Sequence, residues 1–224
     1  RSSVHYFFDL PKYTDFLKEW TTSGAVQPEV ANKLAEWLDS GLRAWDISRD
    51  APYFGFLVPG TEDKYFYVWL DAPIGYMASF KNFCDNTNQV AFDDFWGPSN
   101  TSEVHHFIGK DILKTHAIFW PTMLHAMGAP LYAGLNVGGF LMGDDGQKMS
   151  KTLGNVVDPF ELASKYSADA VRYYLVKDVP YGQDSAISEA ALVDRYNADL
   201  ANDLGNLASR ARALLLRHLE GRLP

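Results

Sequence analysis

Two lysines, Lys148 and Lys151, stand three residues apart in a stretch that glycine interrupts repeatedly, at Gly138, Gly139, Gly143, Gly146 and Gly154. Such a segment can move, and its two ammonium groups can approach a polyphosphate. Positive charge placed there would stabilise a transition state in which pyrophosphate leaves an α-phosphate. The alternative is a surface hairpin whose lysines contact only solvent, and composition alone favours that alternative.

The residues before these lysines predict a parallel sheet of the α/β class. Three apolar runs are typical of strands that are buried on both faces, at residues 65–70, 104–108 and 132–137. Helical patterns separate the runs, and the resulting order of strand, helix, strand, helix, strand is typical of βαβ units. Ligands of open parallel sheets bind where the strands end, which makes three loops candidate site segments: 71–73, 109–111 and 138–154.

Helical patterns flank this sheet. Before it, Thr14 is expected to cap a helix that runs through Trp20, and Pro28 is expected to begin another that Gly41 stops. Pro121 is expected to kink or restart the helix that follows the second strand. The Asp-Gly pair at 145–146 predicts a hairpin turn. After the lysines the sequence pattern predicts only helices. The first begins at the Asp-Pro-Phe-Glu tetrapeptide at 158–161, which combines a capping side chain with proline at the first helical position.

Composition excludes several classes of protein. The chain has 224 residues, of which 47% are hydrophobic, so it can bury a core. Cys84 is the single cysteine, which excludes a disulfide framework and a Cys-x-x-Cys zinc site and fits a reducing cytoplasm. His105 and His106 are adjacent on a predicted strand and point in opposite directions, so no metal site is expected. No apolar stretch approaches the roughly 20 residues of a membrane span, and no membrane partner is expected.

The formal net charge of −8 argues against general binding to nucleic acid, because such binding depends on many Lys and Arg contacts to phosphates. Arginines gather near the end of the sequence, and they leave open either a local RNA surface or an ordinary solvated helix face.

The pentapeptide Lys148-Met149-Ser150-Lys151-Thr152 resembles the KMSKS signature of class I aminoacyl-tRNA synthetases, with Thr152 keeping the hydroxyl of the last serine. The resemblance implies a loop that closes over the phosphates of ATP, with Mg²⁺ accompanying the nucleotide and no structural zinc in this chain. It assigns the catalytic role to Lys148 and Lys151, and contacts to ATP to Met149 and Ser150 as well.

Two further segments resemble the methionyl-tRNA synthetase family in particular. Residues 67–76 are similar to the segment that lines the methionine side chain, which implies a wall formed by Trp69, Ala72, Pro73 and Tyr76. Residues 106–116 are similar to the second segment of that pocket, which implies that Gly109 and Asp111 lie near the adenylate and that Ile112 and His116 border methionine. An apolar, aromatic pocket suits a thioether. Without the resemblance, a buried aromatic strand and a core histidine would be the preferred interpretations.

Two other segments resemble the same family. Residues 45–55 are similar to the connection that re-enters the sheet, but Leu57 stands where some bacterial members carry an acidic residue that approaches the ribose. Residues 206–210 resemble the start of the anticodon-binding helices. Asn206 and Arg210 lie four residues apart, so they share a helix face and either contact the tRNA anticodon or form an ordinary polar surface.

The second class I signature, His-x-Gly-His, does not occur in the sequence. The resemblance therefore implies the second half of a Rossmann-type parallel sheet followed by an all-α region, with four parts: a helical connector at 1–50, a catalytic half at 51–155, stem helices at 156–187 and the start of the anticodon-binding bundle at 188–224. We expect a piece of a methionine–tRNA ligase that meets the missing N-terminal half of the catalytic domain in cis or in trans. Alone, it should activate methionine poorly.

The implied reaction joins methionine and ATP into methionyl adenylate and then transfers the methionyl group to tRNA(Met). Two alternatives stay open at this point. The chain could come from the leucine, isoleucine, valine or cysteine enzyme of the same class, although residues 69–76 argue against this. It could also be a noncatalytic tRNA-binding relic of the fold, because fold alone does not establish function.

Overall fold

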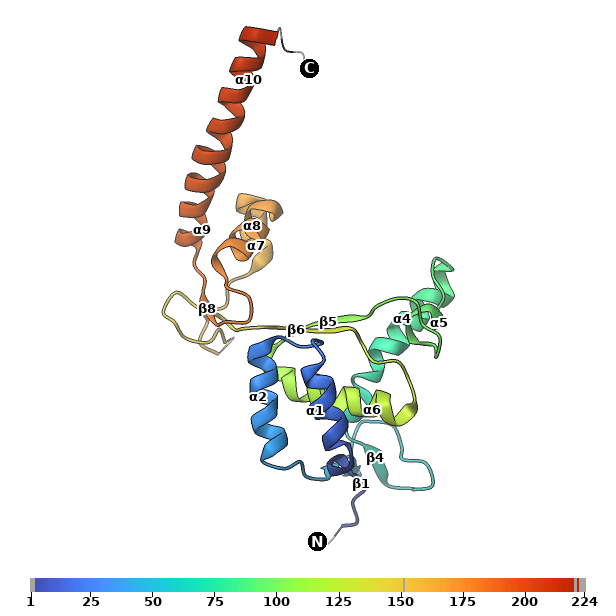
Figure 1. The fold of residues 1–224 in the computed structure, drawn as a ribbon. Coiled ribbons are helices and arrows are strands. Elements are labelled where there is room, and N and C mark those ends of the chain that lie inside the picture. The colour runs from blue at the N-terminus through green and yellow to red at the C-terminus, as the bar shows by residue number, and fades with distance from the viewer. Residues whose placement is uncertain (1–2, 151, 220, 222–224) are drawn as a thin grey trace. The chain divides into compact units, whose positions relative to one another are not determined.

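The computed structural model describes residues 3–150, 152–219 and 221. The chain divides into two compact units, Arg1–Val137 and Gly138–Pro224, which are described separately (Figure 1). Both α-helices and β-strands occur, as the α/β prediction requires. The finer division into four parts stays a prediction. Within the described part of the chain, no helix is both long enough and apolar enough to cross a membrane.

The first unit opens with a 3-10 helix, two α-helices and three short strands, in the order β1 (Phe7–Phe8), η1 (Leu10–Tyr13), α1 (Thr14–Thr22), α2 (Pro28–Asp39), β2 (Trp45–Asp46) and β3 (Ser48–Asp50). Helices α1 and α2 confirm the two predicted helices, but Thr14 is not the cap of α1, because it lies inside the helix and its hydroxyl donates to the Pro11 carbonyl over 2.8 Å. The proline of α2 stands in its first turn, where no backbone N–H donor is needed. The three strands have no counterpart among the elements predicted from the sequence. β1 pairs with β2, and β3 pairs with β4 (Lys64–Phe66), both antiparallel.

The predicted strand at 65–70 is wrong beyond Phe66. The chain leaves β4 there and forms α3 (Val68–Asp71), followed by α4 (Ile74–Thr87) and α5 (Asp93–Trp96). The run is not buried on both faces, because Val68 and Trp69 are exposed. A short aromatic and β-branched run is compatible with either structure, and tertiary context decides between them. Here the pairing of β4 with β3 stops at Phe66, which lies opposite Ser48, the first residue of β3.

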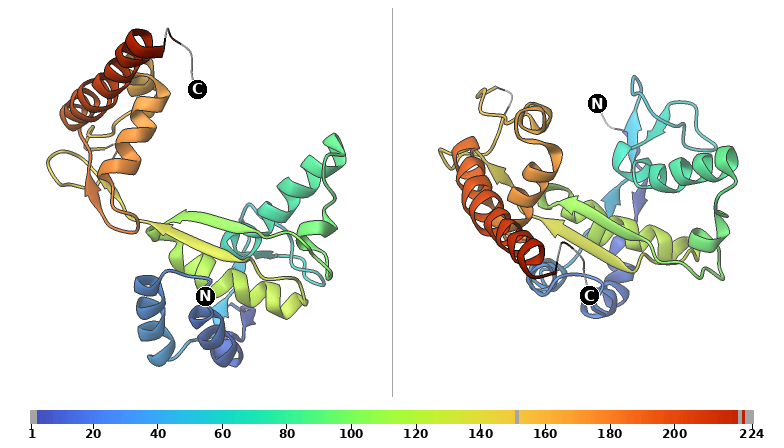
Figure 2. Two further views of the ribbon diagram at one scale, coloured as in Figure 1. Left: turned by 45° about the horizontal axis from the view of Figure 1, so that its top comes forward. Right: turned by 90° about the horizontal axis from the view of Figure 1, so that it is seen from above.

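The other two predicted strands are confirmed as β5 (His105–Gly109) and β6 (Gly134–Gly138), which form a two-stranded sheet. They run in the same direction in Figures 1 and 2, because the chain returns through a helical crossover. The crossover contains η2 (Lys110–Ile112), η3 (Thr115–Phe119) and α6 (Trp120–Met127). The expected disturbance at Pro121 is confirmed, since η3 is a single π-helical segment and α6 restarts with the proline in its first turn.

Helices α1, α2 and α6 lie on one side of the β5–β6 pair (Figure 2). Their apolar residues form one core with the inward side chains of β6, including the fully buried Leu17, Leu34, Trp120 and Leu135. The free edge of β6 is covered by residues 25–27, because the Leu135 N–H donates to the Ala25 carbonyl over 2.7 Å. The Gln27 carboxamide also bonds to both backbone groups of Val137. Covering an edge in this way prevents pairing with a foreign strand.

The second unit contains a β-hairpin and a set of helices: β7 (Leu141–Met142), α7 (Pro159–Tyr166), α8 (Ala168–Asp178), β8 (Ser185–Ala186), α9 (Glu189–Arg195), η4 (Tyr196–Leu204) and α10 (Gly205–Leu219). The Asp158 carboxylate accepts a hydrogen bond from the Phe160 N–H at the start of α7, which confirms the predicted cap. The expectation that everything after Thr152 is helical is wrong at β8, which pairs with β7 in parallel.

A separate small core holds the second unit together. It is built from Leu162, Val171, Tyr174, Ile187 and Leu192, which come from α7, α8, α9 and the segment after β8. Helix α10 contributes nothing to it, and none of its described side chains is buried.

Candidate functional site

The four residues predicted to form a wall lie on one face of the α3–α4 segment. Ala72 and Pro73, which join the two helices, both have right-handed helical dihedral angles, so the chain continues helically from Val68 to Thr87. Positions 69, 72, 73 and 76 recur at the spacing of one helix face. Pro73 is buried, whereas 38% of Trp69 and 40% of Tyr76 remain exposed. The helix therefore gathers side chains that an extended strand would have spread over two faces.

A hydrogen bond joins this wall to the second predicted segment. The Tyr76 hydroxyl lies 2.7 Å from Nε2 of His116, and Nδ1 of His116 lies 3.0 Å from the Ile112 carbonyl oxygen. Because a carbonyl oxygen only accepts, Nδ1 carries the proton and Nε2 accepts from Tyr76. Burial lowers the pKa of His116, which is only 4% exposed, although the Ile112 carbonyl opposes this shift. Burial also raises the pKa of Tyr76. The contact is thus between two neutral groups.

His106, the first residue of the second predicted segment, belongs to the same cluster, although no individual role was predicted for it. Its ring centroid lies 4.8 Å from that of Tyr76 and 5.7 Å from that of His116. Its Nε2 accepts a hydrogen bond from the indole N–H of Trp120 over 3.1 Å. Burial, and then the neighbouring His116, lower its pKa from 6.5 to about 4. The signal that could have revealed it is a polar residue in the middle of an apolar strand, on the face opposite His105.

Gly109 and Asp111, predicted near the adenylate, lie where β5 ends and η2 begins. Both are exposed. The Asp111 side chain folds back over Gly109, since a Cβ atom on Gly109 would stand 2.8 Å from Oδ1 of Asp111. Ile112, the last residue of η2, is half-buried.

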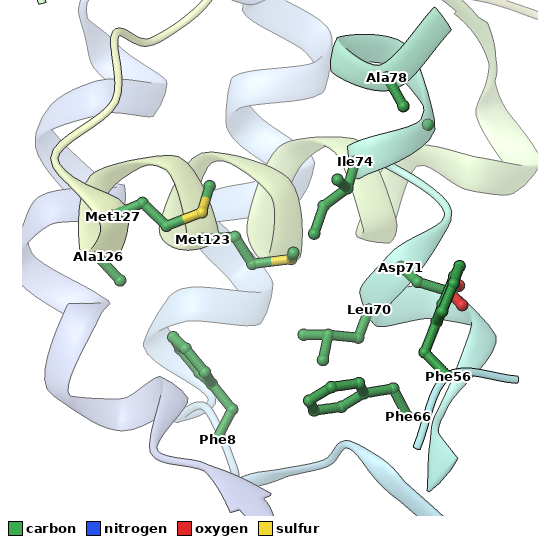
Figure 3. A pocket seen from close by; sticks show the side chains of 11 residues that line it. Phe8, Phe56, Phe66, Leu70, Asp71, Ile74, Ala78, Met123, Ala126 and Met127 are labelled. Atoms are coloured by element: carbon green, nitrogen blue, oxygen red, sulfur yellow. The ribbon is translucent and has the colours of Figure 1, made fainter. Parts of the chain in front are cut away.

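Of the cavities that adjoin the α3–α4 segment, two lie beside residues 70–80. The larger, about 570 Å³, lies on the opposite side from Trp69 and Tyr76 and is lined by none of the predicted site residues. Figure 3 shows its largely apolar lining, much of which comes from α3, α4 and α6. Among the described residues that line it, Asp71 is the charged one. The lining consists of Phe8, Phe56, Phe66, Leu70, Asp71, Ile74, Gly75, Ala78, Met123, Ala126 and Met127. The smaller, about 290 Å³, is lined by both Tyr76 and His106. The smaller cavity is therefore the one that adjoins the predicted wall.

The lysine-bearing loop belongs to the second unit, and the predicted hairpin turn is confirmed. Met142 and Lys148 form an antiparallel bridge, the Gly143 N–H donates to the Gln147 carbonyl over 2.8 Å, and Gly146 has a φ of 71°. Lys148 is exposed, with its ammonium nitrogen 4.1 Å from the centroid of the Phe140 ring. Such a position is a cation–π contact.

Within the rest of the pentapeptide, Met149 and Ser150 are half-buried, and Met149 packs against the small core of the second unit. Lys151 lies outside the described residues. The loop thus presents Lys148 to solvent from a backbone that is anchored on both sides.

Three remaining predictions concern exposed positions and metals. Asn206 and Arg210 lie on α10, and both are exposed. Leu57, at the position of the expected ribose contact, forms an isolated antiparallel bridge with Tyr65 and is exposed. Among the residues that the structure describes, no group of three or more His, Cys, Asp or Glu side chains could hold a metal ion.

Comparison with known proteins places these observations in one family. The family model for tRNA synthetases class I (M) matches residues 1–212. A structure of Mycobacterium tuberculosis methionyl-tRNA synthetase bound by methionyl-adenylate superposes with a TM-score of 0.81 at 39% identity, over 98% of this chain and 42% of that chain. A second complex of the same enzyme with methionyl-adenylate gives 0.81 at 37% identity, and its apo form gives 0.79 at 36%, over the same shares of both chains.

This chain therefore spans less than half the length of those solved relatives. The matched region nevertheless includes both the wall in the first unit and the lysine-bearing loop in the second. On the strength of the family model and the three structural matches, the chain belongs to the class I tRNA synthetases of the methionyl type.

Proposed function

We propose that this chain is part of a methionine–tRNA ligase, which forms methionyl adenylate from methionine and ATP and then transfers the methionyl group to tRNA(Met). The observation that carries the proposal is the hydrogen bond between Tyr76 and His116, because it joins two segments that the resemblance assigns independently to one methionine pocket. Family membership and relatives bound to methionyl-adenylate support the same conclusion.

The cluster offers a chemically suitable surface for methionine. Its wall consists of Trp69, Ala72, Pro73 and Tyr76, with Ile112 and His116 bordering it. The lowered pKa of His116 keeps the imidazole neutral, so no charge faces an apolar thioether side chain. Aromatic rings make favourable contacts with sulfur, and the half-exposed Trp69 and Tyr76 are available for them.

In the activation step a methionine carboxylate oxygen attacks the α-phosphorus of ATP, and the bond to pyrophosphate breaks. No side-chain nucleophile is needed, so catalysis consists of positioning and charge stabilisation. Lys148 and Lys151 would neutralise the charge that develops on the leaving pyrophosphate, with Met149 and Ser150 beside the nucleotide. Gly109 and Asp111 would contact the adenosine part. Mg²⁺ would enter with ATP, since no metal cluster is available among the described residues.

Three further elements complete the proposal. The rest of the catalytic domain would act in cis or in trans, so that this chain alone exchanges pyrophosphate below the rate of a full enzyme. Asn206 and Arg210 would contact the anticodon of tRNA from the exposed face of α10. We also propose that the protein acts in the cytoplasm.

The test uses a synthetase that contains this chain together with the rest of its catalytic domain. Methionine-dependent ATP–pyrophosphate exchange is measured for the unaltered enzyme and for Lys148→Ala, with leucine, isoleucine, valine and cysteine as competing substrates. We expect methionine to be preferred and the substitution to lower kcat by at least about tenfold, as removal of one charge-stabilising group does. Exchange that depends on another amino acid would assign a different member of the class. Exchange that Lys148→Ala leaves unchanged would contradict the role of the loop.

A conservative substitution tests the methionine wall separately. Tyr76→Phe keeps the ring and removes the hydroxyl that bonds to His116. This substitution should raise the KM for methionine severalfold and leave the KM for ATP unchanged. The matched control is Tyr181→Phe, at an exposed tyrosine of the second unit, which should change neither KM.

A further inference from the structure

The lysine-bearing loop is fixed at its base by contacts with residues 183–185. The Ser185 N–H donates to the Phe140 carbonyl over 3.0 Å, and the Phe140 N–H donates to a carboxylate oxygen of Asp184 over 2.8 Å. Gly139 approaches Gln183 so closely that an added Cβ would stand 2.0 Å from its carbonyl oxygen. The strand that leads into the hairpin is therefore held in place before it reaches Lys148.

Beyond the hairpin, the backbone turns around Ser150. The N–H groups of Leu153 and Gly154 both donate to the Ser150 carbonyl over 3.1 Å, and the Thr152 N–H donates to Oγ of Ser150 over 3.2 Å. Gly154 has a φ of 67°, a left-handed conformation that glycine adopts without strain. This turn brings Asn155 back toward the start of the pentapeptide.

The half-buried Asn155 side chain joins the two ends of that turn. Its Oδ1 accepts a hydrogen bond from the Ser150 N–H over 2.8 Å, and its Nδ2 donates to the Lys148 carbonyl over a longer 3.5 Å. The same Nδ2 would stand 3.3 Å from a Cβ on Gly143, so the carboxamide also lies against the first turn of the hairpin. One side chain thus bonds to the backbone on both sides of Met149.

We propose that Asn155 is a positioning residue, which clamps the backbone of Lys148 and Ser150 so that the Lys148 ammonium is presented to the phosphates of ATP. The inference rests on the proposed function and adds a residue to which the sequence motif gave no role. A carboxamide suits the task because it supplies an acceptor and a donor at once. An aspartate would keep the acceptor for Ser150 but would set a second oxygen against the Lys148 carbonyl. An alanine would lose both contacts.

The first part of the experiment measures the loop itself, in the chain described here. Amide hydrogen exchange at Ser150 is compared by NMR among the unaltered protein, Asn155→Ala, Asn155→Asp and the control Asn197→Ala, at an exposed asparagine of η4. Loss of one net hydrogen bond should speed exchange at Ser150 about fivefold in Asn155→Ala. Asn155→Asp should stay within about twofold of the unaltered protein, because its oxygen still accepts from Ser150.

The second part measures catalysis, in a synthetase that contains this chain with the rest of its catalytic domain. Asn155→Ala should lower kcat/KM for ATP about tenfold in methionine-dependent ATP–pyrophosphate exchange and leave the KM for methionine unchanged, a split that general unfolding would not produce. Asn155→Asp should fall between Asn155→Ala and the unaltered enzyme, and Asn197→Ala should match the unaltered enzyme.

The outcomes separate the inference from the proposed function. If the unaltered enzyme shows no methionine-dependent exchange, the proposed function fails. If it does, and Asn155→Ala leaves either the Ser150 amide or the ATP kinetics unchanged, the positioning role is overturned while the proposed function stands.

Discussion

Protonation of the buried His106 should destabilise the first unit in mild acid. The imidazole is only 7% exposed and accepts the indole N–H of Trp120, an arrangement that requires an unprotonated Nε2. Its pKa in the folded protein is about 4, against an ordinary value of 6.5. Because the folded pKa is the lower one, the unfolded chain binds more protons between these two pH values. Stability must therefore fall as the pH decreases through that window.

The magnitude follows from the two pKa values. Between pH 7 and pH 5, His106 should remove about 2 kcal/mol from the free energy of unfolding. His106→Gln tests this, because glutamine can offer an oxygen near the position of Nε2 to the Trp120 N–H but does not titrate. The burial-lowered pKa of His116 acts in the same direction and is present in both proteins, so the comparison isolates His106.

The assay is urea unfolding followed by tryptophan fluorescence at pH 7 and at pH 5. All six tryptophans lie between residues 20 and 120, so the signal reports on the first unit alone. His218→Gln, at an exposed position of α10, controls for the loss of an imidazole elsewhere. The unaltered protein should lose about 2 kcal/mol more than His106→Gln between the two pH values. Parallel losses in the two proteins would refute the argument from burial.

Four further substitutions test the local stability of the two units. Gly139→Ala should weaken the pairing of β7 with β8 by about 2 kcal/mol, through the collision with Gln183, as seen in amide exchange at Ser185. Gly75→Ala, where a Cβ meets nothing within 4 Å, should cost no stability. Asp158→Ala should remove about 1 kcal/mol of local stability from α7, which amide exchange at Phe160 would report; an unchanged rate would show that the cap is dispensable. Leu17→Ala, at a fully buried position, should lower the free energy of unfolding of the first unit by about 3 kcal/mol in the fluorescence assay.

Local signals in the sequence predicted most of the helices, because their causes lie within a few residues. The cap at Asp158, the break at Pro121 and the turn at 145–146 each depend on neighbouring backbone groups. Strand pairings between distant segments were not predictable in this way. β8 is two residues long and contains Ser185 and Ala186, too short and too polar to produce a pattern, and it exists because β7 supplies its hydrogen-bond partners.

In the candidate site, too, the contacts between distant segments could not be predicted from local signals. Motif resemblance named Tyr76 and His116, but neither periodicity nor composition could reveal that a hydrogen bond connects them across 40 positions of sequence. The misassigned strand at 65–70 shows why, since the apolar run was real but its conformation was set by β3 and by packing elsewhere. His106 was missed because the role of a polar residue in a core depends on its partners, and Trp120 lies fourteen residues away.

The exposed leucines of α10 should make the helix content of this protein depend on whether a partner covers them. Its 15 residues bury no described side chain, while 65% of Leu207 and 57% of Leu214 face solvent. Helix α10 continues without a break from η4 and α9, where the buried Leu192 anchors the chain. Its last turns have no such anchor among the described side chains, so they should fray and re-form on the microsecond scale. A partner that covered these leucines would shift that equilibrium toward the helix. Its arrival would then be visible as a gain in circular dichroism at 222 nm, without any label on either molecule.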